Sequence, residues 1–265
     1  MTTLIELFED LQKLIIDKTD VATRALLSKT SKKFHGLAAK CSKDKVPYKL
    51  DIKPFIASGN LEVVKYLAQM PHHIWKASYC STAADAGQLE VLKWLRSNNC
   101  PWDKETCNRA VTGGYLEVLQ WVRQEGCPWD GTTSLRAAAC GRLEIFKWVI
   151  QEGCPWTKDA FSVAAGCGHC PIIEFAVQNN YELDLLGCLR GATKWGYLTV
   201  LEYLNQSHSW VTNISREVAE ELCFSAILGG YENIILWFKT NSLAWNAETR
   251  ALAVKRWPNT FLLSN

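Results

Sequence analysis

Cysteine and histidine side chains are the residues of this chain best suited to metal binding or nucleophilic chemistry. One segment, Cys167-Gly168-His169-Cys170, carries three of them at the spacing of a Cys-x-x-Cys pair. Structural zinc needs four protein ligands, and the sequence holds no second pair at a recognisable zinc-site spacing. We therefore predict neither a metal nor a cofactor, and we expect His169 to have a structural role in a turn.

The rest of the sequence lacks the motifs that accompany catalysis. Histidine occurs only five times, and there is no Gly-rich phosphate loop, His-Glu-x-x-His pair or nucleophile elbow. The chain is therefore predicted not to be an enzyme, and no small-molecule substrate is expected.

Most of the eleven cysteines recur at fixed positions along the chain. The recurring sets are Cys100, Cys127 and Cys154; Cys80, Cys107 and Cys188; and Cys140 and Cys167. Equivalent residues of stacked helices lie about 10 Å apart, beyond the roughly 7 Å Cα separation that a disulfide tolerates. We therefore predict small buried residues with free thiols in a reducing, cytoplasmic compartment.

A period of 27 residues organises the middle of the chain. The tripeptide Cys-Pro-Trp occupies 100–102, 127–129 and 154–156. A second motif, Gly-x-Leu-Glu, keeps nearly the same phase and begins at Gly59, Gly87, Gly114 and Gly141. Such regular spacing predicts a repeat architecture, in which each unit contacts chiefly its neighbours.

Each repeat is predicted to form two helices. Asp103 is a suitable N-cap for a short first helix that ends at the glycine motif. After this glycine, apolar residues recur at helical spacing over 116–125, and Gly126 is a suitable C-cap. Pro128 then disfavours helix at the preceding residue, so an extended link follows the second helix.

These helix pairs resemble the ankyrin repeat. Paired small residues stand four and three positions before the glycine, as in Ala83-Ala84 and Ala137-Ala138, and Gly-x-Leu-Glu-x-Leu follows. Ankyrin units are typically about 33 residues long, so the 27-residue unit here implies that the projecting hairpin is shortened. The resemblance covers roughly residues 50 to 257, and the variant resembles the compact Cys-Pro-Trp ankyrin arrays found in proteins of large DNA viruses and of some algae and oomycetes. It implies an all-α, ankyrin-like solenoid of stacked helix pairs with a short helical N-terminal module.

Two series of large residues, each with one member per repeat, indicate how many repeats the chain contains. The first comprises Trp75, Trp102, Trp129, Trp156, Leu183, Trp210 and Trp245, and the second comprises Tyr66, Trp94, Trp121, Trp148, Phe175, Tyr203 and Trp237. Both series predict about seven repeats, and we expect each to form a continuous aromatic column in the core. The last step lengthens to 35 and 34 residues, which predicts an insertion over 211–221 that extends a first helix.

The composition is that of an ordered globular protein. Hydrophobic residues make up 48% and charged residues 21% of the 265, and the formal net charge is +2. A charge this small predicts no strong attraction to nucleic acid. No apolar run approaches the roughly 18 residues that a membrane-spanning helix needs, and acidic Glu6 argues against a signal peptide.

The first forty residues resemble an F-box. Apolar residues recur at helical spacing over 4–15 and again over 21–34. F-boxes dock on the adaptor Skp1 and attach a substrate-binding domain to a cullin ubiquitin ligase. The resemblance implies that the adaptor contacts are Leu7, Leu11, Leu14, Leu26 and Phe34. The Leu-Pro that usually opens an F-box is missing, however, because Ile5 follows Leu4. A plain N-terminal cap on the first repeat is the alternative.

The predicted domain organisation has three parts. Residues 1–40 form the F-box-like module or cap, 41–50 form a basic linker, and 51–265 form the repeat array. The lysines around the linker could touch phosphates, but without arginines or regular aromatic partners they are interpreted as a solvated surface.

Ankyrin arrays bind proteins with the concave surface formed by their first helices. In this sequence the residues proposed to bind a target there are Arg109, Arg136, Arg190, Lys194 and Trp195. Two functions therefore remain open. One is a substrate receptor that links a target to a Skp1–cullin ligase. The other is a scaffold or minor structural component of a viral particle, found in the host cytoplasm and the virion.

Overall fold

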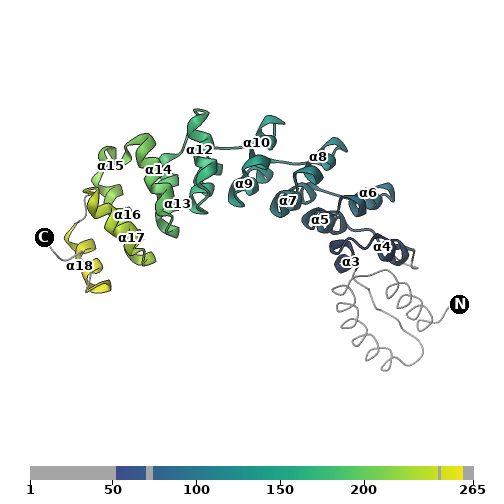
Figure 1. Ribbon diagram of the computed structural model, residues 1–265, viewed down its shortest axis with the longest axis horizontal. Helices are drawn as coiled ribbons and strands as arrows, with labels where there is room; N and C mark the ends of the chain where they lie inside the picture. The colour runs from purple at the N-terminus through teal and green to yellow at the C-terminus, as the bar shows by residue number, and fades with distance from the viewer. Residues whose placement is uncertain (1–51, 70–73, 244–245, 259–265) are drawn as a thin grey trace, which may run out of the picture. The chain divides into compact units, whose positions relative to one another are not determined.

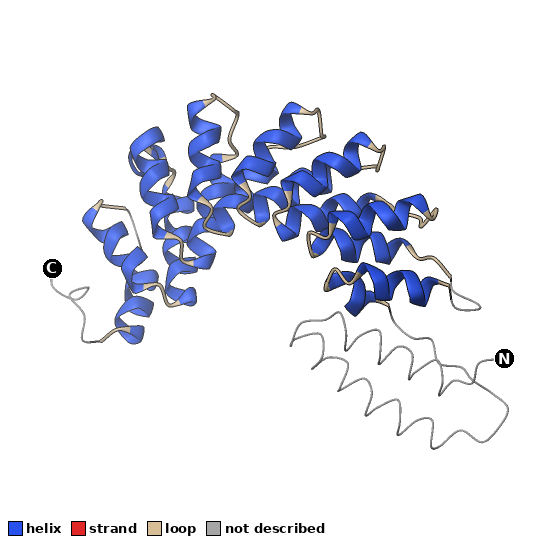
Figure 2. Cartoon of the chain, turned by 45° about the vertical axis from the view of Figure 1, so that its right-hand side comes forward, coloured by secondary structure: helices blue, strands red, loops and turns tan. Residues whose placement is uncertain are grey.

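The computed structural model describes residues 52–69, 74–243 and 246–258. All sixteen regular elements in these ranges are α-helices, numbered α3 to α18, most of which are labelled in Figure 1, and none is a strand (Figure 2). The predicted all-α class is therefore confirmed for this part of the chain. The predicted adaptor contacts and the basic linker lie outside the described residues, as does Trp245. None of the described helices is long and apolar enough to cross a membrane.

The described chain falls into two compact units that divide between Cys127 and Pro128. The helices of the first unit are α3 (Lys53–Ala57), α4 (Leu61–Ala68), α5 (Ala77–Asp85), α6 (Leu89–Ser97), α7 (Lys104–Gly113) and α8 (Leu116–Gln124). Those of the second are α9 (Gly131–Ala139), α10 (Leu143–Gln151), α11 (Asp159–Gly166), α12 (Cys170–Gln178), α13 (Leu185–Trp195), α14 (Leu198–His208), α15 (Trp210–Asn213), α16 (Arg216–Gly229), α17 (Glu232–Thr240) and α18 (Ala247–Arg256).

Side-chain caps and left-handed glycines set the helix ends. The predicted cap at Asp103 is confirmed, because its carboxylate accepts a hydrogen bond from the Glu105 N–H at 3.0 Å. Asp130 makes the equivalent bond to the Thr132 N–H. At the other end of α13, Gly196 has φ +85°, a conformation that costs glycine little. Gly126, with φ +81°, was predicted to cap α8, but the C-cap is Glu125 and Gly126 stands one residue beyond it.

The second helix of each pair buries one regular apolar face. In α8 the buried residues are Val118, Leu119 and Val122, and in α10 they are Ile145, Phe146 and Val149. Positions i, i+1 and i+4 face the first helix, while the glutamates just before them, Glu117 and Glu144, are exposed. This pattern comes directly from the Leu-Glu-Val-Leu motif.

The first helices pack against one another. In the first unit α5 contacts both α3 and α7, and in the second unit α11 contacts α9 and α13, α13 contacts α16, and α16 contacts α18. Small residues allow this close approach: Ala83 and Ala110 are completely buried. Between α11 and α13, a Cβ on Gly191 would lie only 3.1 Å from the Gly166 Cα. The core of each unit therefore lies between its layers of first and second helices.

The insertion near residues 211–221 differs from the prediction. A separate short helix, α15, starts at Trp210, and the chain is extended at Ile214 before α16 begins. The first helix α16 is lengthened to 14 residues, as expected, but it accounts for only part of the insertion. Trp210 supplies the reason, since it is 2% exposed and its indole N–H donates to the Leu201 carbonyl at 3.1 Å, which anchors α15 on α14.

The predicted aromatic columns are wrong. Rings of the two series pair with each other instead: Trp75 with Trp94 at 5.9 Å, Trp102 with Trp121 at 6.0 Å, and Trp129 with Trp148 at 5.8 Å between centroids. The described tryptophans of both series are half-buried apart from Trp210, so they seal the edge of the core rather than fill it. Edge-to-face pairs of this kind are favoured by the ring quadrupoles.

Candidate functional site

The Cys-x-x-Cys segment is occupied by structural contacts. The His169 ring covers Gly141, where a Cβ would lie 2.4 Å from Nδ1, and His169 Nε2 lies 2.9 Å from the Ala139 carbonyl oxygen. The Cys170 thiol donates to Glu174 Oε1 at 3.6 Å. No group of three His, Cys, Asp or Glu side chains in the described ranges could hold a metal ion. The expected structural role of His169 therefore has a direct geometric basis.

The Cys-Pro-Trp cysteines share one contact. Each thiol donates to the carbonyl of the residue 24 positions earlier, which is the N-cap of a first helix: Cys100 to Lys76 at 3.5 Å, Cys127 to Asp103 at 3.3 Å, and Cys154 to Asp130 at 3.4 Å. All three are buried, and none of them forms a disulfide. A recurring bond of this kind ties each extended link to the preceding first helix, which explains why cysteine repeats at this position.

The remaining cysteines differ in how deeply their side chains are buried. A hydrogen bond to the Cys100 thiol, together with burial, raises the pKa of Cys80, so this thiol stays protonated. Burial raises the pKa of Cys188 to about 12. Cys140 and Cys167 were expected to be buried but are half-buried, because they lie at the exposed ends of their first helices. None of the ten cysteines in the described residues forms a disulfide.

Two of the predicted target-binding arginines make ion pairs within the chain. Arg109, on α7, donates to Glu105 Oε1 at 2.7 Å and lies 3.9 Å from Asp85. Arg190, on α13, contacts both carboxylate oxygens of Glu221, on α16, at 2.8 and 2.7 Å. These bonds lower the pKa of the Glu221 carboxyl, and their two-point geometry joins the exposed faces of α13 and α16.

The other predicted residues fall in different surroundings. Arg136 is half-buried on α9 in the second unit, whereas Arg109 belongs to the first unit. Lys194 and Trp195 end α13, one turn beyond Arg190, and the Lys194 ammonium lies 5.6 Å from the Trp195 ring centroid. The structure thus brings Arg190, Lys194 and Trp195 together.

Two exposed apolar residues adjoin this group and were not predicted. Trp195 is 59% exposed, and on α16 Phe224 is 42% and Leu228 is 62% exposed. Phe224 and Leu228 are four residues apart on the helix face that also carries Glu221, which contacts Arg190. We call Trp195, Phe224 and Leu228 the α13–α16 patch.

Turn contacts align the ends of α13 and α16. Tyr231, just after α16, packs on Gly196, just after α13, where a Cβ would lie 2.5 Å from its ring. Trp195 stands one residue before Gly196, and Leu228 stands two residues before Gly230, the C-cap of α16. Both residues therefore lie at the same end of neighbouring first helices. Tyr115 and Tyr197, although also exposed, cover glycines in the same way as Tyr231 and so have a packing role.

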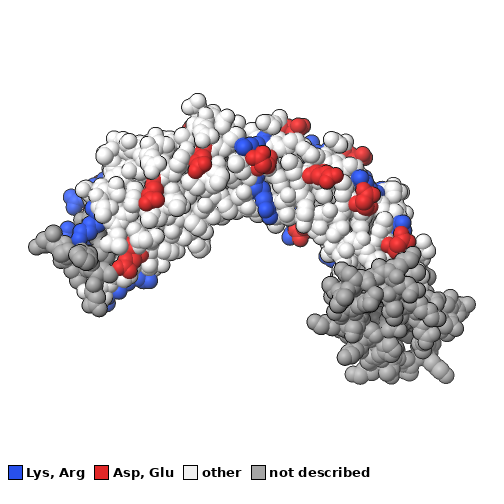
Figure 3. Space-filling view, in the orientation of Figure 1, with Lys and Arg blue, Asp and Glu red and all other residues white. Residues whose placement is uncertain are grey.

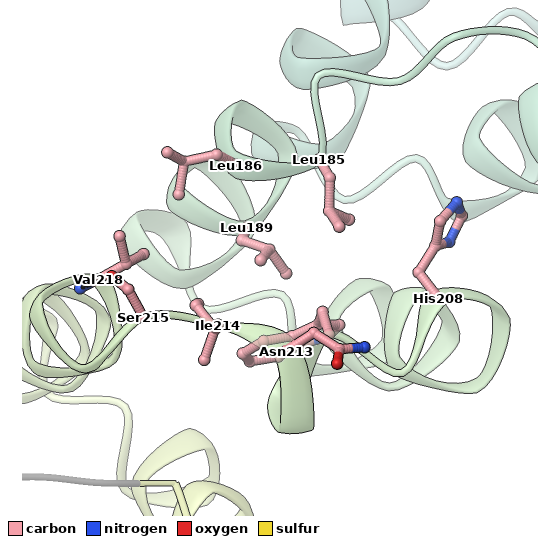
Figure 4. A pocket seen from close by; sticks show the side chains of 9 residues that line it. Leu185, Leu186, Leu189, His208, Asn213, Ile214, Ser215 and Val218 are labelled. Carbon is pink, nitrogen blue, oxygen red and sulfur yellow. Dashed lines mark hydrogen bonds between the residues drawn. The ribbon is translucent and has the colours of Figure 1, made fainter.

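An apolar pocket lies at the opposite end of the same helices. Its volume is about 330 Å³, near the lower end of the range for ligand sites. Leu185 and Leu189 of α13 face Ile214 across the pocket, and His208 stands at its edge (Figure 4). The remaining lining residues are Leu186, Trp210, Asn213, Ser215 and Val218. The insertion at α15 forms one wall, and the lengthened spacing before Trp245 was the sequence signal for it.

His208 is the one titratable side chain lining the pocket, and its Nδ1 lies 2.8 Å from the Ser207 hydroxyl oxygen. On the side shown in Figure 3, the surface over α13 and α14 is mostly uncharged, and basic side chains gather near α18. Large exposed apolar side chains on rigid helices are suited to binding another macromolecule.

The chain matches no known protein-family model, and no curated protein sequence matches it.

Proposed function

We propose that this protein is a non-enzymatic, protein-binding repeat array of the ankyrin type, and that the α13–α16 patch is its main binding surface. The observation that carries the proposal is the exposure of Trp195 and Leu228, 59% and 62%, at the aligned ends of two packed first helices. Both side chains would be covered by a partner.

Three features support the ankyrin-type assignment. Helix pairs recur, with α5, α7 and α9 starting 27 residues apart at Ala77, Lys104 and Gly131. Each pair turns at a glycine with positive φ, and small residues let the first helices approach closely. Stacked helix pairs of this kind present their first helices as one surface, which is suited to recognition.

A protein partner suits the patch better than a small molecule. Two aromatic side chains and one aliphatic side chain lie on an open surface, not in an enclosed cavity. Trp is among the residues that contribute most to protein interfaces, particularly where helices hold it in place. The Trp195 ring lies beside Gly166 of α11, where a Cβ would be 3.7 Å from its Cδ1, whereas Phe224 and Leu228 lie on α16. A partner segment that covers all three side chains therefore crosses the ends of neighbouring first helices, which are spaced about 10 Å apart.

The receptor hypothesis adds a role for the N-terminal module. In it, residues 4–37 dock a Skp1-type adaptor while the array holds a target for ubiquitination. In the scaffold alternative, the same residues cap the array and both ends of the chain make permanent contacts, as in a minor component of a viral particle. Affinity purification from the native cell distinguishes the two, because it recovers an adaptor and a cullin in one case and particle proteins in the other.

The binding surface is tested by the same purification with variants. We expect Trp195→Ala combined with Leu228→Ala to lose the proteins that the unchanged chain retains, while its helical circular dichroism is unaltered. Ile74→Ala is the matched control, since Ile74 is 63% exposed and lies in the first unit. Equal recovery with the double variant and the unchanged chain would contradict the assignment of the patch.

A further inference from the structure

Two cations flank the α13–α16 patch. Lys194 lies on α13 beside Trp195, and Arg256, at the end of α18, reaches Gly230, where a Cβ would lie 2.5 Å from its Nη2. Gly230 follows Leu228 by two residues. The patch therefore has one basic group at its α13 side and another at its α18 side.

Neither cation has a carboxylate partner among the described residues. Lys194 contacts the Trp195 ring, and the Arg256 guanidinium lies 5.6 Å from the Trp257 ring centroid. Neighbouring arginines differ, because Arg190 pairs with Glu221 and Arg216 pairs with Glu220. Within the described chain, the positive charges of Lys194 and Arg256 beside the patch are thus not balanced by a carboxylate, whereas those of Arg190 and Arg216 are neutralised by their glutamate partners.

We propose that the partner is an acidic, amphipathic protein segment, an inference that rests on the proposed function. Its apolar side chains cover Trp195, Phe224 and Leu228, and its carboxylates pair with Lys194 and Arg256. Apolar burial supplies most of the binding, whereas the two charge pairs determine orientation and exclude basic segments. The spacing from Phe224 to Leu228 is one helical turn, about 6 Å, so a helix of roughly three turns spans the surface.

A nucleic acid fits this surface less well. Trp195 could stack on a base, but Phe224 and Leu228 offer no hydrogen bonds to base edges. Two cations are also few for a nucleic-acid site, whose affinity depends on many phosphate contacts. A protein segment with a few carboxylates beside apolar side chains matches both the sign and the small number of the charges at Lys194 and Arg256.

The test is a selection of displayed random peptides, about 12 residues or three helical turns long, on the full-length chain. We expect the selected sequences to be enriched in Asp and Glu next to Leu, Phe or other large apolar residues. The same selection on a Lys194→Glu, Arg256→Glu variant should lose the acidic enrichment, and on Trp195→Ala it should enrich nothing.

The best selected peptide, made with a fluorescent label, then gives affinities by anisotropy. The double charge reversal should weaken its binding about tenfold or more, and a copy of the peptide with Lys in place of each acid should bind the reversed variant better than the unchanged chain. Lys76→Glu, an exposed lysine of the first unit, is the matched control and should have no effect.

The outcomes separate this inference from the proposed function. If the selected peptides need Trp195 but show no acidic preference, the charge inference is wrong and the binding surface stands. If the selection enriches nothing on the unchanged chain, or if an oligothymidine binds the patch more tightly than the best peptide, the acidic-segment proposal is overturned. Whether the patch binds protein at all is decided separately by the recovery of cellular proteins with Trp195→Ala and Leu228→Ala.

Discussion

The guanidinium carbon of Arg96 lies 4.0 Å from the ring centroid of Trp102. Arg96 belongs to α6, Trp102 stands in the link before α7, and the same guanidinium donates to the Cys100 carbonyl. The Trp102 ring also makes an edge contact with Trp121 of α8, at 6.0 Å between centroids. One indole ring is therefore held between a cation of the preceding helix pair and an aromatic ring of its own pair. It joins the two pairs although it is only half-buried.

We expect Arg96→Ala to lower the free energy of unfolding by about 2 kcal/mol, from the lost stacking and the lost hydrogen bond. Urea titration of the full chain measures this. Arg96→Lys keeps the charge but not the planar group, so it should recover less than half of the loss. Full stability of Arg96→Lys would show that the planar stacking does not matter.

Two glycines separate backbone strain from ring packing. Gly168 and Gly153 both have positive φ, +77° and +74°, but a Cβ on Gly168 would lie 2.4 Å from the Tyr197 ring, whereas Gly153 has nothing within 4 Å. Both Ala substitutions should cost about 1 kcal/mol of strain, and Gly168→Ala should cost about 1–3 kcal/mol more because the ring must move. Equal losses in thermal or urea unfolding would rule out the ring contact as a packing constraint.

Thiol reactivity should follow burial and pKa. We expect iodoacetamide, followed by mass spectrometry of the folded chain, to label half-buried Cys140 and Cys167 before the fully buried cysteines. Cys170 should react slowly near pH 8, because burial and the Glu174 carboxylate raise its pKa to about 11. Its rate should increase with pH towards that value, since the thiolate is the reactive form.

Glu174→Gln should accelerate labelling of Cys170 by lowering its pKa, whereas Glu152→Gln, at an exposed position on the same unit, should not. If the two variants react alike, Glu174 does not influence this thiol.

The Arg190–Glu221 pair should contribute to stability only above acidic pH. Its hydrogen bonds lower the pKa of Glu221 in the folded chain. The contribution is therefore present above the ordinary glutamate pKa of about 4.3 and is lost as the pH falls through the lower folded value. We expect Glu221→Gln to be slightly less stable than the unchanged chain at pH 7, with the difference disappearing near pH 3. Both groups are about half exposed, so the effect is small. A difference that persists in acid would assign the loss to packing.

The N-terminal module decides between receptor and scaffold. If residues 4–37 form an F-box, the full chain should bind Skp1, and Leu11→Asp with Leu14→Asp should abolish binding without unfolding the array, because the apolar residues face a partner. Isothermal titration and circular dichroism measure the two effects.

A cap would behave in the opposite way. No adaptor would bind at micromolar concentration, and the double substitution would melt the first helix pairs. That result would leave the scaffold hypothesis.

Local sequence features determined the helix pairs. Asp103 predicted the start of α7, and the glycine motif predicted the turns, since a capping carboxylate and a left-handed glycine act within a few residues of where they stand. The 27-residue period likewise located the buried faces of the second helices. Within the candidate site, the position near the end of a first helix was sufficient to single out Lys194 and Trp195.

Tertiary structure alone decided which side chains meet and which stay exposed. The sequence could not show that Trp102 pairs with Trp121 rather than with its own series, because equal spacing along the chain does not specify ring orientation. Phe224 and Leu228 stand at the helical spacing of core residues, yet they face solvent, since the opposite face of the lengthened α16 packs on α13 and α18. Burial depends on the neighbours that cover a helix, and these neighbours come from distant parts of the sequence.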